Sequence, residues 1–413
     1  QRRTVNSMAS YFGRNYFSYN SDYCVIFDFR KVPERWKLCR CSEGLERKLT
    51  RKMEKKLKNR IEEIQKALKN SQIQCVLIED RSNRHYLTRA DVWQGSLLVT
   101  ETKAVLLVDF RYYQMAVSGV KDCDVKLCKN IDEGIRKCIK DWKIKCLGFE
   151  TGILSWKRYQ KLVSMLEGVK LDETFCADNI VKECRKIKDE EELTYLRQAQ
   201  KIADRAYDHI LNVARIGMKE SDIRMALGTF MIRQGSEGFD IGYISSSGVK
   251  TSLPHGGFGD KVIENGDLLM IDFGAIVQGY RSDMTRTFGF GTISSRQKEV
   301  YQIVQQAQKQ ALDNIHPGMK GKEVDKIARD FIKEAGFDGC FEHGLGHSIG
   351  LDGHENPRFN EVEEEVLRPG VVMTVEPGIY LTDEFGVRIE DMGVVTEQGF
   401  ENFTKATKEL IIL

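Results

Sequence analysis

The spacing of hydrophobic residues divides the chain into stretches of different predicted structure. From Met53 the pattern predicts a helix and a short buried strand, and further apolar runs of strand length then alternate with polar segments. The predicted strands are CVLIED (75–80), SLLVT (96–100), AVLLVDF (104–110) and CLGFE (146–150), and the second and third flank a polar tripeptide that favours a hairpin. A helix is predicted over 156–166. Residues 53–180 are therefore expected to form a small mixed α/β domain.

A second region, over residues 185–413, begins with a predicted helix and contains an internal repeat. Between Asp189 and Ala214 apolar residues recur at spacings of three and four, which is typical of a helix that packs one face on a core. Further on, GMKESDIRMALGTFMIRQG (217–235) aligns without gaps with GMKGKEVDKIARDFIKEAG (318–336). Each copy is predicted to be a helix that another helix precedes and two strands follow. This duplication predicts approximate two-fold symmetry, and a site between the halves would take ligands from both.

Two acidic residues are predicted to lie close together in the first half of the repeat. DLLMIDFGAIVQGYRSDMTRTFGFG (267–291) predicts two strands around a turn near Val277 and Gln278. A hairpin centred there sets Asp272 directly opposite Asp283, and opposed residues project from one face with Cβ atoms about 5 Å apart. Two carboxylates at that distance need a proton, a cation or exposure to solvent. The pair alone therefore leaves open a metal site or two solvated aspartates.

The second half contains a cluster of histidines. EHGLGHSIGLDGHE (342–355) holds three of the chain's histidines, which are His343, His347 and His354. Its glycines argue against a helix, and in an extended strand His343 and His347 would share one face. A lone histidine is usually structural, but three that cluster near carboxylates favour a functional site.

Two glutamates complete the set of candidate ligands. TVEPGIY (374–380) and GVRIED (386–391) are predicted strands that flank a turn and supply Glu376 and Glu390. In the second strand Arg388 lies on the same face as Glu390 and could pair with it. With the two aspartates and one histidine, the set contains four carboxylates and one imidazole. Such a set suits Mn²⁺ or Co²⁺ better than a thiolate zinc site, and its charge balances two divalent ions.

These residues lie in sequence strings that resemble a known family. The order Asp, Asp, His, Glu, Glu within IDFG, SLPHGG, SDMTRTF, HGLGHSIGLDGHE, TVEPGIY and VRIEDMGVV resembles the pita-bread metallopeptidases: aminopeptidase P, prolidase and methionyl aminopeptidase. The resemblance covers about residues 185–413, and 53–180 resembles more weakly the N-terminal domain of the aminopeptidase P and prolidase branch. It implies an α/β (α+β) fold, in which a smaller mixed α/β domain precedes a creatinase/aminopeptidase-like pita-bread catalytic domain with an internal two-fold repeat.

The resemblance implies a role for each candidate ligand. The implied metal ligands are Asp272, Asp283, His347, Glu376 and Glu390. Asp272 would chelate one ion, and Asp283 and Glu390 would bridge both ions. His347 and Glu376 would complete the other ion, and Glu376 is also placed to shuttle protons.

Four further side chains match catalytic positions of the family. His255, in SLPHGG, and His354 match histidines that assist substrate binding and the transition state, and His343 and Arg388 match supporting positions. Gly353 departs from the family pattern, which usually has a branched apolar residue there. We therefore expect a difference in the shape of the pocket wall and none in the metal site.

The implied activity is that of a dinuclear-metal aminopeptidase that hydrolyses the N-terminal Xaa-Pro peptide bond by a metal-bridging hydroxide. The expected cofactors are two divalent metal ions, Mn²⁺ first, with Co²⁺ or Zn²⁺ as alternatives. The expected substrate is a peptide with proline in the second position. The main alternative is a prolidase restricted to Xaa-Pro dipeptides. An inactive pita-bread binding protein is disfavoured, because such relatives lose metal ligands and all five are intact here.

Composition and charge restrict the partners. Residues 1–52 carry 12 Lys and Arg against 5 Asp and Glu and show no periodic pattern, so we expect an N-terminal extension that is not part of the catalytic fold. The whole chain has a net charge of +2 and this segment a net of +7, so the remainder is mildly acidic and lacks a nucleic-acid footprint. Scattered cysteines and the lack of a membrane-spanning apolar run predict a cytoplasmic protein without a membrane partner. The family resemblance also implies that the protein forms a homodimer.

Overall fold

The computed structural model describes residues 59–69 and 71–413, so the predicted extension over residues 1–52 lies outside the described residues. The described residues belong to one compact unit, Lys58–Leu413. Among them, no helix has both the length and the apolar character that crossing a membrane requires.

A mixed sheet with flanking helices forms the N-terminal part, residues 59–187. Its strands follow the order β4-β3-β2-β1-β5-β6. β2 and β3 pair antiparallel, which confirms the predicted hairpin, and β1 pairs parallel with β5. The strands are β1 (Cys75–Ile78), β2 (Ser96–Thr100), β3 (Ala104–Val108), β4 (Asp124–Leu127), β5 (Cys146–Phe149) and β6 (Lys170–Cys176). The helices are α2 (Arg60–Lys69), α3 (Arg81–Thr88), α4 (Phe110–Gly119), α5 (Ile131–Asp141), α6 (Trp156–Met165) and α7 (Ala177–Lys186).

The helix α8 (Glu190–Val213) begins the C-terminal part and is fixed at its start by a capping box. The Asp189 side chain accepts a hydrogen bond from the Glu192 backbone at 3.0 Å, and the Glu192 carboxylate accepts one from the Asp189 backbone at 2.9 Å. These bonds satisfy backbone N–H groups that have no partner within the first turn of a helix. Arg60 Nη2 also donates to Asp189 at 2.8 Å, so α2 of the N-terminal part is tied to the start of α8.

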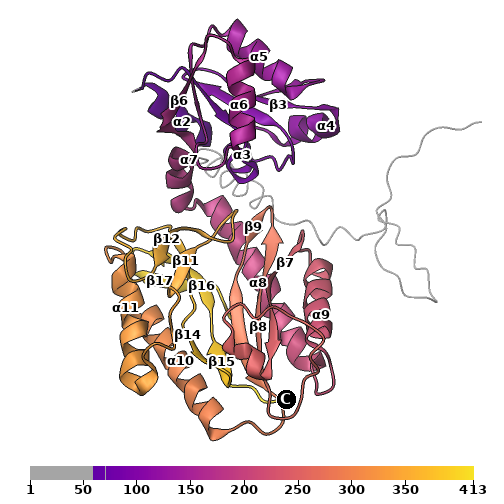
Figure 1. The fold of residues 1–413 in the computed structure, drawn as a ribbon, viewed down its shortest axis with the longest axis vertical. Helices are drawn as coiled ribbons and strands as arrows, with labels where there is room; N and C mark the ends of the chain where they lie inside the picture. Colours follow the sequence, from indigo (N-terminus) through magenta and orange to yellow (C-terminus); the bar gives the residue numbers. More distant parts are fainter. Residues whose placement is uncertain (1–58, 70) are drawn as a thin grey trace, which may run out of the picture. The chain divides into compact units, whose positions relative to one another are not determined.

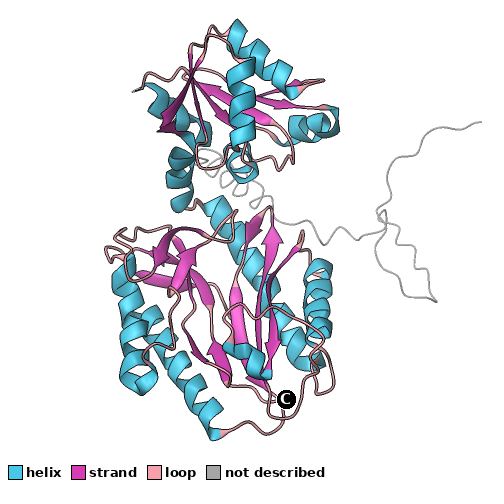
Figure 2. Cartoon of the chain, viewed as in Figure 1, coloured by secondary structure: helices cyan, strands magenta, loops and turns pink. Residues whose placement is uncertain are grey.

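Two copies of a helix–helix–strand unit form the C-terminal part (Figure 1). The first contains α8, α9 (Glu220–Arg233), β7 (Phe239–Ser247), β8 (Leu268–Val277) and β10 (Met284–Gly289). The second contains α10 (Ser295–Asn314), α11 (Gly321–Ile332) and a sheet of order β12-β11-β13-β16-β17, with β11 (Gly346–Ser348), β12 (Glu355–Phe359), β13 (Val372–Val375), β16 (Asp391–Thr396) and β17 (Gly399–Asn402). The strands lie in the middle and the four helices lie on the outside (Figure 2).

The two copies match in backbone detail as well as in the order of their elements. Lys219 and Lys320, which the sequence alignment pairs, each form an antiparallel bridge with a residue that lies six positions before a later strand, Val262 before β8 and Val366 before β13. That strand, β8 in one copy and β13 in the other, follows a glycine with a positive φ, which is 91° at Gly266 and 92° at Gly370. The predicted two-fold repeat is therefore confirmed in the structure.

One cluster of buried apolar side chains joins the N-terminal and C-terminal parts. Val76 and Leu97 of the N-terminal sheet lie in the same cluster as Ile349, Val372 and Val394 of the C-terminal part. Separate clusters lie under α8 and α9 and under α10 and α11. Because buried apolar surface contributes about 25 cal/mol per Å² to folding, the shared cluster ties the two parts together.

The hairpin that carries the two aspartates turns one residue later than predicted. β8 pairs with β9 (Tyr280–Arg281) around Gln278 and Gly279, whose φ values are 50° and 76°. Two consecutive positive φ values are typical of a type I′ turn. Glycine adopts such a φ readily, whereas the β-branched Val277 of the predicted turn does not.

This turn changes the register of the aspartates. Asp272 pairs with Thr285, so the prediction that Asp272 lies directly opposite Asp283 is wrong. Asp283 lies two positions before Thr285, and side chains two positions apart on a strand project from the same face. The two carboxylates are therefore diagonal neighbours across the hairpin.

The two predicted strands that carry the glutamates are each interrupted at the glutamate. TVEPGIY is divided between β13 and β14 (Gly378–Leu381), and GVRIED is divided between β15 (Phe385–Arg388) and β16. Glu376 and Glu390 lie in the two gaps. Pro377 has no N–H group to donate to a neighbouring strand, which accounts for the first interruption.

We expect Gly279→Ala to lower the free energy of unfolding by more than Gly168→Ala. Both glycines have a similar positive φ, 76° and 74°, so both variants should lose about 1–2 kcal/mol through backbone strain. A Cβ atom at Gly279 would also lie 2.7 Å from His85 Cε1, whereas one at Gly168 meets no heavy atom within 4 Å. Urea unfolding of the two variants measures the difference, and equal losses would contradict the expectation.

Candidate metal centre

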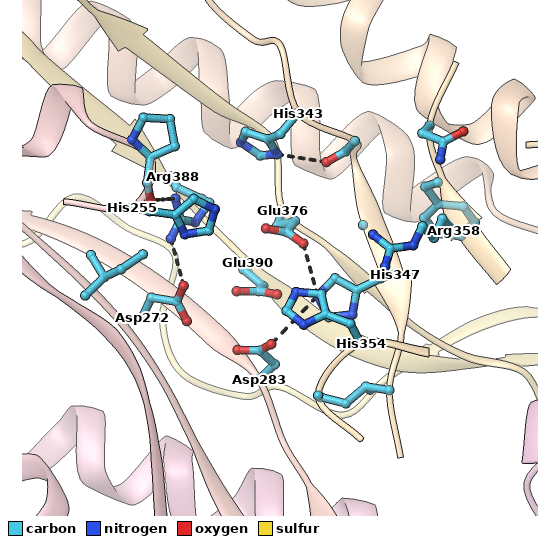
Figure 3. Close-up of a pocket in the computed structure, with 18 of the residues that line it drawn as sticks. His255, Asp272, Asp283, His343, His347, His354, Arg358, Glu376, Arg388 and Glu390 are labelled. Atoms are coloured by element: carbon cyan, nitrogen blue, oxygen red, sulfur yellow. Dashed lines mark hydrogen bonds and ion pairs between the residues drawn. The ribbon is translucent and has the colours of Figure 1, made fainter. Parts of the chain in front are cut away.

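The predicted site residues meet at one cavity of about 480 Å³ in the C-terminal part. The first copy of the repeat supplies three of the predicted site residues that line it, which are His255, Asp272 and Asp283. The second copy supplies His343, His347, His354, Glu376, Arg388 and Glu390. Figure 3 shows their polar groups facing one shared space. The structure therefore brings together every side chain that the sequence singled out.

Three of these side chains have the spacing of metal ligands. One ligand atom each of Asp283, His347 and Glu390 lies within 4.8 Å of the other two. Glu376 lies beside this group, because its Oε1 is 3.4 Å from His347 Nε2, and Asp272 lines the same cavity. Carboxylate oxygens with one imidazole nitrogen are a donor set that suits Mn²⁺, Co²⁺ or Zn²⁺.

The neighbouring backbone fixes the tautomer of His347. Its Nδ1 lies 3.1 Å from the carbonyl oxygen of Ser348, and because a carbonyl only accepts, Nδ1 carries the proton. Burial, followed by the nearby His354, lowers the pKa of His347 to about 3, so the ring is neutral. Its Nε2 lone pair therefore faces Glu376 Oε1 and, at 3.8 Å, Asp283 Oδ2. Such groups repel unless a proton or a cation lies between them, which is the arrangement of a metal ligand.

The acidic side chains hold protons more tightly than free carboxyl groups do. Burial is the largest cause that raises the pKa of Asp283 and the pKa of Glu390 well above their ordinary values, and the charges of neighbouring carboxylates add to it. Burial also raises the pKa of Glu376 to about 8, against the opposing charge of Arg388 and with a further contribution from Asp272. Protons or cations are therefore needed to neutralise the group.

Arg388 connects the acidic residues to one another. Its Nη2 donates to Asp272 Oδ2 at 2.8 Å, so the interpretation that Arg388 pairs with Glu390 is wrong. Its Nε donates to Thr285 Oγ1 at 3.0 Å, and Thr285 in turn donates to Glu390 Oε2 at 2.8 Å. Its Nη1 donates to the hydroxyl of Tyr380 at 2.8 Å. One buried guanidinium thus orients two carboxylates, one from each copy of the repeat.

His343 lies at the other end of this hydrogen-bond network. Its Nδ1 donates to the carbonyl of Gly344 at 2.8 Å, so its Nε2 accepts from the hydroxyl of Tyr380 at 2.9 Å. Burial, with the charge of Arg388 as second cause, lowers the pKa of His343 to about 4. The ring is therefore neutral at neutral pH, and the Tyr380 hydroxyl is held between an acceptor and a donor.

His255 and His354 are both exposed at the cavity wall. The ring centroid of His354 lies 4.1 Å from that of His347. The carbonyl just before His255 accepts from Arg388 Nη1 at 3.1 Å, which ties its loop to the network. Gly353 also lines the cavity, and a Cβ atom added there would meet no heavy atom within 4 Å. The wall is therefore open at the position where the sequence predicts a difference in shape.

The sequence reasoning missed four side chains of the site, which are Thr285, Thr374, Tyr380 and Arg358. Thr374 Oγ1 accepts from the His347 backbone at 3.0 Å and donates to Glu376 Oε1 at 3.4 Å. The period of a strand could have indicated the two threonines, since each lies two residues from a predicted ligand. Arg358 faces His347 across β11 and β12, a pairing that no local pattern indicates.

Comparisons with known proteins identify two families along the chain. Metallopeptidase family M24 matches residues 194–397, and the creatinase/prolidase N-terminal domain matches residues 60–187. A similar protein is the Xaa-Pro dipeptidase of Pyrococcus horikoshii, which is 37% identical over 356 residues, 86% of this chain and 99% of that protein.

Solved structures of similar proteins share the fold. The Xaa-Pro dipeptidase from Bacillus anthracis has a TM-score of 0.82 at 37% identity, over 86% of this chain and 99% of that one. The X-Pro aminopeptidase from Thermotoga maritima has a TM-score of 0.78 at 35% identity, over 83% of this chain and 98% of that one. These matches confirm the predicted creatinase/aminopeptidase-like pita-bread fold and its preceding α/β domain. The chain belongs to metallopeptidase family M24 and is a metal-dependent peptide hydrolase.

Proposed function

We propose that the protein is an Xaa-Pro dipeptidase, which cleaves the bond between a first residue and the proline that follows it. The names of relatives that the chain covers almost completely support the preference for proline. The sequence favours an aminopeptidase that accepts longer peptides and keeps the dipeptidase as its alternative. The observation that favours the dipeptidase is the guanidinium of Arg358 in the cavity.

Arg358 offers a binding group for the free carboxylate of a dipeptide. It lines the cavity, and among residues 59–69 and 71–413 it has no carboxylate within ion-pair distance. Figure 3 shows it on the side of the cavity opposite His255 and Asp272. Guanidinium and carboxylate groups form strong, charge-assisted hydrogen bonds. In a dipeptide the proline itself carries that carboxylate, whereas in a longer peptide the carboxylate lies further along the chain.

We further propose that two divalent ions, Mn²⁺ first, bind this centre. Asp272, Asp283, His347, Glu376 and Glu390 would hold them. The support is the donor set, in which a neutral imidazole turns a lone pair toward carboxylates whose pKa values are raised by burial and by one another. When bound, such ions polarise the substrate carbonyl and lower the pKa of water to about 7.

The side chains of the chain itself would bind the substrate and move protons. His354 and His255, exposed at the cavity wall, would hydrogen-bond the substrate on either side of the scissile bond. Thr374 donates to Glu376 Oε1, which leaves Oε2 free to carry a proton to the departing proline nitrogen. Arg388 would hold Asp272 and, through Thr285, Glu390 in place.

The proposal predicts that Ala-Pro is hydrolysed with at least about tenfold higher kcat/KM than Ala-Ala. The proline ring fixes φ, so less chain entropy is lost on binding, and apolar contact with a ring is worth about 1–3 kcal/mol. Chromatography of the released amino acids measures both rates. Glu376→Gln, which keeps the size of the side chain, is the control for background activity. Equal efficiencies would exclude proline specificity and leave the family assignment intact.

Replacement of Arg358 should affect only substrates that carry the proline carboxylate. We expect Arg358→Met to raise KM for Ala-Pro by about ten- to a hundredfold, because a hydrogen bond to a charged group is worth about 1.5–3 kcal/mol. Ala-Pro amide, which lacks the carboxylate, should be cleaved equally by the variant and the unchanged protein. Arg296→Met alters an exposed arginine and serves as control. A similar loss on acid and amide would argue against the dipeptidase.

Metal removal should make the stability of the protein depend on pH. In the metal-free protein the pKa of Glu376 is about 8, above its ordinary value of 4.5, so between these values the folded state binds more protons than the unfolded state. His343 and His347, whose pKa values are lowered, oppose this trend below about pH 7, because they are neutral in the folded state and still charged in the unfolded state. The free energy of unfolding should therefore fall as pH rises from 7 to 8, by at least about 1 kcal/mol.

Chelated protein, unfolded in urea at a series of pH values, provides the measurement. Mn²⁺ should stabilise the protein more at pH 8 than at pH 6, and Glu376→Gln should flatten the slope of the chelated protein. Glu299→Gln, at an exposed glutamate, should leave that slope unchanged. A stability that rises over this range in the chelated protein would refute the expectation.

A further inference from the structure

His354 lies in a short loop whose position depends on groups outside the metal centre. The loop, residues 349–354, connects β11 to β12, and acidic residues flank the histidine at Asp352 and Glu355. The loop forms no helix or strand. Its backbone contacts include a bond from Asp352 N–H to Glu355 Oε1 at 3.2 Å. Arg281 also ties the first half of the loop, since its backbone N–H donates to the carbonyl of Gly350 at 2.9 Å and its Nε donates to the carbonyl of Leu351 at 3.2 Å. Closer to His354, side-chain contacts with neighbouring elements hold the chain at Asp352 and Glu355.

Two buried cations hold Asp352 in this loop and Glu355 at the start of β12. Arg185, the last but one residue of α7, donates through Nη2 to Asp352 Oδ2 at 2.6 Å and also to Glu355 Oε1. Lys188 donates to Glu355 Oε2 at 3.2 Å and to Ser348 Oγ at 3.0 Å. Burial alone would raise the pKa of Glu355, but Lys188 and Arg185 outweigh it and hold that pKa at about 2. The two charged pairs thus fix both ends of the segment around His354.

The N-terminal part orients Arg185 in turn. Asn83, in α3, accepts a hydrogen bond from Arg185 Nη1 at 2.9 Å and donates one to Glu150 Oε1 at 2.8 Å. The other oxygen of Glu150 accepts from the backbone of Glu79 and Asp80, at 2.6 and 2.8 Å, just before α3. A guanidinium only donates and a carboxylate only accepts, so an amide satisfies both neighbours at once. Asn83 is 1% exposed, so both of these bonds are shielded from solvent.

We propose that Asn83 is a positioning residue for His354, acting through Arg185 and the pair Asp352 and Glu355. It does not line the catalytic cavity. The inference rests on the proposed function, in which His354 contacts the substrate. A displacement of about 1 Å at a reacting group can lower a rate by about a hundredfold, so the N-terminal part influences catalysis without touching the substrate.

The test is a double-variant cycle between Asn83 and His354. Asn83→Ala should lower kcat for Ala-Pro by about tenfold or more, with KM and the bound Mn²⁺ per chain within about twofold of the unchanged protein. In a His354→Ala background the same substitution should change kcat by less than about twofold, because the group that it positions is gone. Equal losses in both backgrounds would overturn the proposal, and so would an unchanged kcat in Asn83→Ala.

Asn130→Ala is the matched control. Asn130 caps α5 in the same part of the chain, where its side chain accepts from the backbone of Asp132 and Glu133 at 2.9 and 3.3 Å. Loss of a helix cap lowers stability by about 1 kcal/mol, so this variant reproduces a local loss of stability without a link to the loop. It should keep kcat unchanged, and a loss of kcat equal to that of Asn83→Ala would overturn the proposal.

Hydrogen–deuterium exchange separates this inference from the proposed function. Amides of residues 349–355 should exchange faster in Asn83→Ala and at an unchanged rate in Asn130→Ala, whether or not the protein cleaves Ala-Pro. Unchanged exchange there would overturn the inference, and faster exchange in a protein that cleaves no Xaa-Pro peptide would overturn only the function. If Asn83→Ala fails to fold, Asn83→Ser takes its place, because a serine side chain stays polar but is too short to keep both the bond from Arg185 and the bond to Glu150.

Discussion

Repulsion between buried carboxylates is the constraint on which the C-terminal part depends. Asp283, Glu376 and Glu390 have raised pKa values because each is removed from water and faces the negative charge of other acids. A fold tolerates such a group only if its members are held apart from solvent by stiff elements and neutralised together. The sheets of the two copies provide the stiff elements. Arg388, Thr285 and Thr374 orient the carboxylates.

Much of the fold and of the candidate site could be predicted from the sequence, because these features depend on residues that lie close together along the chain. The hydrophobic spacing indicated four of the six strands of the N-terminal sheet and the long helix α8, and the alignment of two segments indicated the repeat. The spacing did not indicate β4 and β6. The ligand candidates were visible because acids and histidines are rare next to buried apolar runs. All of them line one cavity.

The remaining features depend on contacts between distant segments or on fine backbone geometry. The register of the aspartate hairpin followed from two positive φ values at Gln278 and Gly279, and a shift of one residue at the turn moved the partner of Asp272 from Asp283 to Thr285. Arg388 has a neighbour of opposite charge two residues away, yet it binds an acid from the other half of the repeat. Periodicity shows which residues of one strand share a face. It carries no information about pairs between residues of different segments, such as Arg388 and Asp272.

The glycines that precede β8 and β13 show that two acids of the site lie at equivalent positions of the duplicated unit. Asp272 lies six residues after Gly266, and Glu376 lies six residues after Gly370, so the two acids occupy equivalent places in the two copies. An ancestor of half the length, with one acid at this place, would have presented two carboxylates to a shared cation as soon as two copies associated. Gene fusion would then have preserved an existing pair of acids, and the asymmetry among the proposed metal ligands, of which only the second copy supplies a histidine, would be a later divergence.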